Sequence, residues 1–235
     1  MFAILKKEVN SFFSSPIAYL VIGVFLLVNG LFLWVFKDNF NILNAGFADL
    51  NSFFFLSPWL FLFLIPAITM KSFADELNSG TLEILKTKPL TDWEIVLGKF
   101  TASLLLVCIA LTPTLTYVYT VYLLGNPVGN IDMGSTTGSY LGLLFLAATY
   151  TSIGLYTSTL SKNQIVSFIL SMSITFILFY GFEYIGTSIQ FTQQFGINEH
   201  FKSISRGVID TRDIIYFCSV TFFFLFITKQ QLKNE

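Results

Sequence analysis

The sequence predicts an all-α integral membrane protein with six transmembrane helices. Only 11% of its 235 residues are charged and 54% are apolar, with a mean hydropathy of +0.71, whereas about 25% of residues are charged in soluble domains. Six stretches approach the roughly 20 apolar residues that a helix needs to cross about 30 Å of hydrocarbon. They are continuously apolar, unlike the alternating strands of a membrane barrel. A net charge of −1 gives no electrostatic reason to expect a nucleic-acid partner.

Residues 1–15 predict a helix that lies in the membrane interface, in contact with lipid. Apolar and polar side chains recur at helical spacing on opposite faces of this segment, which is the pattern of an interfacial helix. The apolar face holds Phe2, Leu5, Val9 and Phe12, and the opposite face holds Lys6, Lys7 and Asn10.

The six predicted spans follow within a single transmembrane domain that covers residues 1–235. Pro58, Pro66 and Pro113 each remove a backbone hydrogen bond, so kinks are expected in the second and third spans. The hydroxyl-rich stretch ATYTSIGLYTSTLS in the fourth span favours close packing against other helices, although it could instead line a substrate path. The spans are residues 17–36, 53–70, 101–124, 139–160, 164–184 and 214–228.

The distribution of lysine and arginine predicts that both termini are cytoplasmic. With the N-terminus inside, the inner segments hold nine lysines and the outer segments hold four lysine or arginine residues. The positive-inside rule places the more basic segments in the cytoplasm. Residues 71–100 are then a cytoplasmic loop between the second and third spans, and residues 185–213 are an outer segment.

Charge is concentrated in the cytoplasmic loop, where residues 74–100 hold 8 of the 27 Asp, Glu, Lys and Arg residues. Asp75 and Glu76 favour the start of a helix, and Gly80 breaks or bends it. Pro89 ends a second short helix, because the residue before a proline avoids helical angles.

The second short helix carries Leu82 and Leu85 three residues apart on one face, with charges of both signs beside them. Thr91 or Asp92 can cap the helix that follows. Anionic lipid would attract basic residues alone, so the mixed charge favours a protein partner. The alternative is an interfacial loop whose charges are simply solvated.

These residues also match a family pattern, E-x-x-x-G-T-x-E-x-L-x-x-x-P-x₈-G-K. The loop therefore resembles the cytoplasmic loop of ABC-2 type transporter permeases, and the resemblance extends over nearly the whole chain. Within that family, the stretches LKKEVNSFFSSPIAYL and HFKSISRGVIDTRDIIYF are similar to the gliding-motility-associated permeases of Bacteroidota. The matching positions are Glu76, Gly80, Thr81, Glu83, Leu85, Pro89, Gly98 and Lys99.

The resemblance implies a permease subunit without its own motor, in the bacterial cytoplasmic (inner) membrane. No G-x-x-x-x-G-K-[ST] phosphate-binding loop occurs in the sequence. ATP and Mg would be bound by a separate cytoplasmic ABC ATPase, and this chain would hold no cofactor, metal or catalytic residue. A second copy of the permease, or a paralogous membrane subunit, would complete the transporter.

Under the resemblance, the loop is the coupling helix that the ATPase grips. Leu82 and Leu85 are expected to enter a groove on the ATPase. Asp75, Glu76 and Glu83 are expected to pair with basic groups of the partner, or with Lys86 and Lys88. Gly80 permits the bend, Thr81 follows it, Pro89 ends the helix, and Lys99 is expected to anchor the third span at the inner surface.

Three other functions remain open on the sequence. An ion-gradient-driven secondary transporter or channel usually needs ionisable groups within the membrane, and only Glu183 lies near a span, where a solvated or hydrogen-bonded carboxylate is expected. An intramembrane enzyme would need a nucleophile with a base, or a metal, and the one histidine, His200, is expected at the surface. A scaffold that uses the ABC architecture mechanically would show the same loop.

The outer segment, residues 185–213, has two interpretations. It could form short re-entrant or interfacial helices, or it could be an ordinary surface loop. The first is supported by four apolar side chains that could stay at the membrane face. These are Phe191, Phe195, Ile197 and Phe201.

Overall fold

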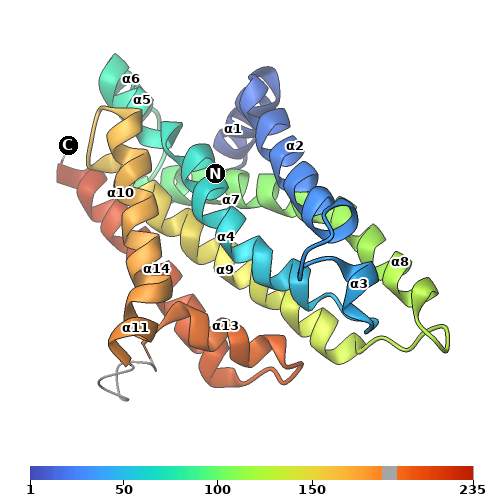
Figure 1. The fold of residues 1–235 in the computed structure, drawn as a ribbon. Coiled ribbons are helices and arrows are strands. Elements are labelled where there is room, and N and C mark those ends of the chain that lie inside the picture. The colour runs from blue at the N-terminus through green and yellow to red at the C-terminus, as the bar shows by residue number, and fades with distance from the viewer. Residues whose placement is uncertain (187–194, 235) are drawn as a thin grey trace.

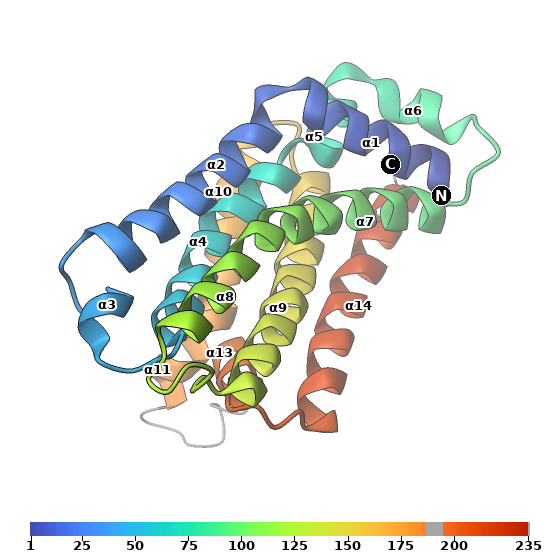
Figure 2. The same ribbon diagram turned by 90° about the vertical axis from the view of Figure 1, so that its right-hand side faces the viewer.

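The computed structural model describes residues 1–186 and 195–234, and all regular secondary structure in these ranges is helical. Figures 1 and 2 show a bundle of long helices with shorter helices at both ends. The α-helices are α1 (Phe2–Ser14), α2 (Pro16–Gly30), α3 (Ile42–Ala45), α4 (Asn51–Thr69), α5 (Lys71–Ser79), α6 (Thr81–Lys86), α7 (Asp92–Leu111), α8 (Leu115–Leu124), α9 (Met133–Thr159), α10 (Gln164–Phe176), α11 (Phe182–Gly186), α13 (Ile197–Ser205) and α14 (Thr211–Asn234). Three short segments of other helical type are η1 (Leu31–Val35), η2 (Thr112–Thr114) and η3 (Ile177–Gly181).

Within the described residues, six helical segments are long and apolar enough to cross a membrane. The last of them continues beyond the predicted span 214–228 at both ends, because its polar ends extend the helix past the apolar part. Phe191 lies outside the residues that the structure describes. The six are Pro16–Val35, Asn51–Ser79, Asp92–Leu124, Met133–Thr159, Gln164–Tyr184 and Thr211–Lys233.

Helix α9 forms the centre of the bundle and packs against α4, α10, α13 and α14. Its hydroxyl-rich half is buried, which confirms that these small polar side chains serve helix packing. Gly154 lies against Thr69 of α4 so closely that a Cβ atom would overlap the threonine side chain. Small residues therefore set how close α4 and α9 can come.

The prolines act differently in the two spans that contain them. Pro58 and Pro66 lie inside α4, which continues through both. Pro113 lies in η2, a 3₁₀ turn that divides the third span into α7 and α8. The break follows from the missing N–H and from the clash of the proline ring with the preceding turn.

The outer segment contains a helix, α13, which packs on the first turns of α9. Gly138 and Gly142 make the contact possible, since a Cβ on Gly138 would collide with the Ile204 carbonyl. Ile197 and Phe201 are buried in this contact. The expectation that these two side chains face the membrane is therefore wrong, because α9 offers them a closer apolar surface.

His200 was expected at the surface, and its side chain is only partly exposed, at 17%. Its Nδ1 lies 2.6 Å from Asp213 Oδ1, and its ring stacks on Tyr216 at 3.9 Å between centroids. Both partners are on α14, so the imidazole holds α13 to the last span.

Both chain ends lie at the same end of the bundle, together with α1, α5 and α6, in the views of Figures 1 and 2. Helices α11 and α13 lie at the opposite end. Helix α1 packs along α7, with Ile4, Glu8 and Phe12 buried. The segment predicted as a cytoplasmic loop is thus largely helical, and it lies beside the N-terminal helix.

Candidate coupling surface

Helices α5 and α6 and the first turns of α7 form a compact element at the end that holds both termini. Helix α5 ends at Gly80, whose φ of +67° is a left-handed conformation that suits glycine. Helix α6 starts directly after it and ends at Lys86. Thr91 and Glu94 then form a capping box that starts α7, so of the two caps that the sequence allowed, Thr91 and Asp92, the structure uses Thr91.

The two leucines of α6 point into the protein. Leu82 is 4% exposed and Leu85 is 9% exposed, in a cluster that includes Phe73, Ile95 and Leu232. The expectation that they form apolar teeth for a partner's groove is therefore wrong. The apolar ends of α7 and α14 cover this face of α6 within the protein.

Helix α6 is also fastened to the end of the last span by a polar contact. The Lys86 ammonium donates a hydrogen bond to the Leu232 carbonyl. This contact replaces the expected pairing of Lys86 with the carboxylates of the loop.

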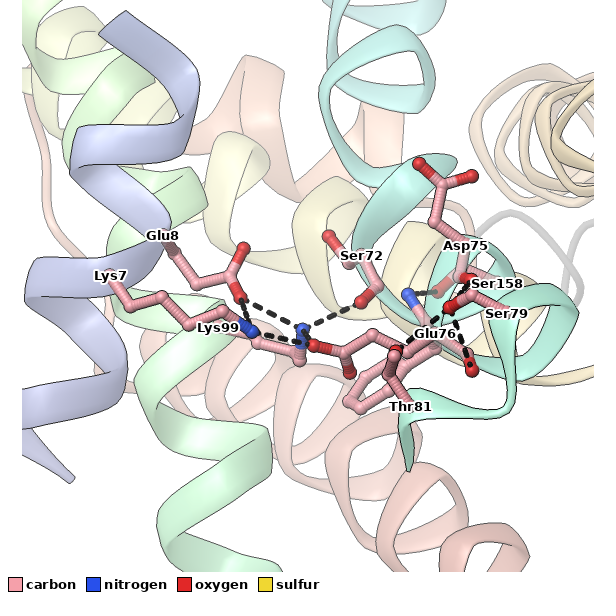
Figure 3. Close-up of polar contacts among 10 residues, drawn as sticks. Lys7, Glu8, Ser72, Asp75, Glu76, Ser79, Thr81, Lys99 and Ser158 are labelled. Atoms are coloured by element: carbon pink, nitrogen blue, oxygen red, sulfur yellow. Dashed lines mark hydrogen bonds and ion pairs between the residues drawn. The ribbon is translucent and has the colours of Figure 1, made fainter. Parts of the chain in front are cut away.

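Four charged side chains from three helices meet beneath α5, and we refer to Lys7, Glu8, Glu76 and Lys99 as the ion cluster (Figure 3). Lys99 Nζ lies 2.9 Å from Glu8 Oε1 and 3.0 Å from Glu76 Oε1. Lys7 Nζ lies 2.9 Å from Glu76 Oε1. The cluster balances two positive and two negative charges and joins α1, α5 and α7.

Lys99 is the centre of this cluster and is only 1% exposed. It also donates to the Ser72 carbonyl at 2.6 Å and lies 5.0 Å from the centroid of the Phe73 ring. Lys99 was expected to anchor the third span by reaching the inner surface, but its ammonium lies inside the protein, where it joins α7 to α1 and α5. Two carboxylates and a carbonyl satisfy its ammonium inside the protein, so it does not need to reach water.

Glu76 was expected to pair with basic groups of the partner, or with Lys86 and Lys88, and within the described chain it pairs with Lys7 and Lys99. Burial by itself would lower the pKa of Lys7, but the hydrogen bond and charge of Glu76 and the charge of Glu8 together raise that pKa above its ordinary value. The second carboxylate oxygen of Glu76 is buried without a hydrogen-bond partner among the described residues. Glu76 is therefore held through one oxygen that two cations share.

Further hydrogen bonds tie α5 to the core and to α10. The Phe73 amide donates to Ser158 Oγ of α9 at 3.2 Å, and the Gln164 side-chain amide of α10 donates to Asp75 Oδ1. Near the bend, Ser79 Oγ donates to the Asp75 carbonyl at 2.7 Å and lies 2.8 Å from Thr81 Oγ1. Asp75, like Glu76, thus serves contacts within the chain.

Where the structure describes its side chains, the outward face of the element is short and polar. It spans the bend after α5, the outer side of α6 and the turn before α7. In residues 1–186 and 195–234, no group of three His, Cys, Asp or Glu residues could hold a metal ion. The exposed residues are Asn78, Ser79, Gly80, Thr81, Glu83, Thr87, Lys88 and Pro89.

Of the predicted site residues, the structure leaves Gly80, Thr81, Glu83 and Pro89 exposed and turns Asp75, Glu76, Leu82 and Leu85 inward or sideways. The sequence did not predict the roles of Lys7 and Glu8 in the ion cluster. Lys7 was placed on the polar face of an interfacial helix, and Glu8 was given no role. The sequence did hold a signal for this ion cluster. Glu76 and Lys99 are the acidic and basic ends of the family pattern, and both lie beside apolar spans. A buried lysine at such a place requires acidic partners.

The chain matches the family model of ABC-2 family transporter proteins over residues 2–207. A comparison with curated proteins gave no match. Permeases of this family have no ATPase domain of their own and bind no cofactor, and they generally pair with an ABC ATPase that binds the ATP. With six apolar helices long enough to span a membrane, and with a match that covers most of its length, this chain belongs to the ABC-2 family of transporter proteins, as a multi-pass membrane permease component.

Proposed function

We propose that the outward face of α5 and α6 is the surface on which a cytoplasmic ABC ATPase docks, and that this chain couples ATP hydrolysis to movement of its spans. The observation that supports the proposal is the difference between the two faces of this element, one exposed and one packed against the other helices. The described side chains of its outer face are exposed and polar, while its inner side is joined to α1, α7, α9, α10 and α14 by apolar and polar contacts. An element built in this way moves together with the helices behind it.

These contacts determine to which helices a force applied to α6 by the ATPase is transmitted. The leucines of α6 transmit it to α7 and α14 through their apolar cluster. The ion cluster transmits it to α1 and α7, and the bonds of Phe73 and Asp75 transmit it to α9 and α10. Such linked helices shift as a packed group, which is the kind of rocking or shear that opens and closes a domain.

The proposal places both termini and the α5–α6 element in the cytoplasm of a bacterium, with the chain in the inner membrane. The common location of both termini with α5 and α6 supports this arrangement, as does the excess of lysine in the inner segments. A second permease copy or a paralogous membrane subunit completes the transporter. The similarity of its end segments to gliding-motility-associated permeases supports a role in export or mechanical work linked to gliding.

Glu83→Lys tests the docking surface, because Glu83 is exposed on α6, its only hydrogen bond outside the helix pattern is made by its backbone carbonyl, which a lysine keeps, and its side chain forms no hydrogen bond or ion pair within the described chain. Tagged protein is purified from gently solubilised membranes of its native host, and the ATPase that co-purifies is quantified by mass spectrometry. Glu199→Lys is the matched control, since it reverses an exposed acid on α13 at the other end. We expect Glu83→Lys to lose most of the ATPase and Glu199→Lys to retain it.

Two outcomes bear on separate parts of the proposal. Equal ATPase recovery with both variants would refute docking on the outer face of α6. A strain that carries Glu83→Lys should also lose surface gliding if the transporter drives motility, and normal gliding despite lost ATPase would refute that role while leaving docking intact. Aspartate at Leu82 or Leu85 is not a clean test, because both side chains are buried.

A further inference from the structure

A cavity of about 590 Å³ lies at the end of the bundle opposite the termini, between α4, α9, η3 and α13. Pockets for small molecules usually have about 300–1,000 Å³. Its walls are largely aromatic, with Phe54 and Trp59 from α4 and Phe179 and Tyr180 from η3. Phe55 also lines it and is 58% exposed, so the apolar wall continues to the outside of the bundle.

The lining changes from apolar to charged along the direction of the spans. Trp59 lies two helical turns inside α4, roughly 12 Å from the helix start at 1.5 Å per residue, and Phe179 lies one turn deeper than Glu183. The charged lining residues lie at the end of the bundle: Glu183 on α11, Lys202 on α13, and Arg206 directly after α13. An amphiphile in a membrane leaflet has the same order of hydrocarbon and headgroup.

The charged mouth carries one positive charge in excess. Glu183 accepts hydrogen bonds from Asn198 at 2.5 Å and from Lys202 at 2.7 Å, which confirms the expected hydrogen-bonded carboxylate and neutralises Lys202. Arg206 also lines the cavity, and no residue in the described part of the chain accepts a hydrogen bond or forms an ion pair with its guanidinium. A guanidinium presents several donors that match a phosphate or carboxylate.

We propose that this cavity binds an amphiphile with one anionic headgroup, with the anion on Arg206 and the hydrocarbon between Phe54, Trp59 and Phe179. The hydrocarbon tail of the amphiphile leaves the cavity past Phe55 and enters the bilayer. Uncharged amphiphiles lack an anion for the guanidinium, in a zwitterionic lipid such as phosphatidylcholine the choline cation offsets the phosphate, and soluble anions lack a group that fills the aromatic walls. The site is remote from α5 and α6, so binding does not require the ATPase.

Trp59 reports on this site directly, since its ring lies in the wall. In a Trp34→Phe, Trp93→Phe background it is the remaining tryptophan of the three. The chain is reconstituted in phosphatidylcholine, and quenching of Trp59 is titrated with phosphatidylglycerol that carries brominated acyl chains. Brominated phosphatidylcholine measures the contribution of lipid that merely surrounds the protein.

We expect the anionic lipid to quench Trp59 at a lower mole fraction than the neutral lipid. Arg206→Gln should weaken the anionic preference by about tenfold, since hydrogen bonds to charged groups are worth about 1.5–3 kcal/mol and each 1.4 kcal/mol is a factor of ten. Arg212→Gln is the matched control, because Arg212 is exposed at the same end of the bundle and does not line the cavity.

Three outcomes would overturn the proposal. The first is equal quenching by the two lipids, and the second is an equal effect of Arg206→Gln and Arg212→Gln. The third comes from a competition with glycerol phosphate, which carries the anion without hydrocarbon: displacement of the lipid at comparable concentrations would show a plain anion site. Phe55→Gln is a second variant that guards against a folding defect, because it alters only an exposed part of the wall. It should weaken lipid binding. It should leave the Trp59 emission of the lipid-free protein unchanged.

Discussion

Replacing Lys99 with methionine removes the cation that two buried carboxylates share. Lys99 is 1% exposed, and it lies 2.9 Å from Glu8 and 3.0 Å from Glu76. Glu76 keeps Lys7 as a partner at 2.9 Å, whereas Glu8 keeps only a longer contact of 3.8 Å with the same lysine. Because removal of one partner leaves a buried charge without compensation, we expect Lys99→Met to cost about 3–5 kcal/mol of unfolding free energy.

A double-mutant cycle separates this electrostatic cost from loss of packing. Glu8→Gln removes the carboxylate that Lys99→Met leaves most poorly paired, so the double variant should recover a large part of the loss. Lys162→Met is the matched control, because Lys162 is exposed at the same end of the protein. Its replacement should change stability by less than about 0.5 kcal/mol.

The assay is reversible unfolding in mixed micelles with increasing SDS, followed by circular dichroism. A cost below about 1 kcal/mol for Lys99→Met, or a double variant no more stable than the single one, would refute the ion cluster as the link between α1, α5 and α7. If the cluster also transmits force, Lys99→Met should still bind the ATPase through the exposed face of α6 but should lose transport-coupled ATP hydrolysis.

Two further perturbations test how the helices meet. Gly154→Ala places a methyl group on the Thr69 side chain, so it should separate α4 from α9 at a cost of about 1–3 kcal/mol; unchanged SDS unfolding would contradict the close approach of these helices. Gly80→Ala must adopt a φ near +67°, which costs about 1–2 kcal/mol for a residue with a Cβ. It should increase hydrogen exchange in α6 while leaving α9 unaffected, and equal exchange in the wild type and the variant would show that the bend is not left-handed.

The chemistry of the sequence determined the class of this protein and the order of its elements. Long apolar runs have one stable arrangement in lipid, because an unpaired backbone polar group there costs several kcal/mol, and this requirement makes them helices. Local rules also placed a helix cap at Thr91 or Asp92, a bend at Gly80 and a disturbed helix at Pro113, since each depends on a residue and its nearest neighbours, whereas α4 continues through Pro58 and Pro66. The hydroxyls of α9 were correctly assigned to packing, because small polar side chains favour close helix contacts.

Tertiary structure decided which way each side chain of the coupling element points. Leu82 and Leu85 have helical spacing, but spacing alone does not say whether their face meets a partner or the ends of α7 and α14. Glu76, Lys99 and Glu8 come together only when α1 lies along α7, a contact between residues 91 positions apart in the chain. The sequence therefore determined that charge gathers in the loop between the second and third spans. The packing of three helices decided that Glu76 and Lys99 form a structural joint with Lys7 and Glu8, while Glu83 and Lys88 stay exposed.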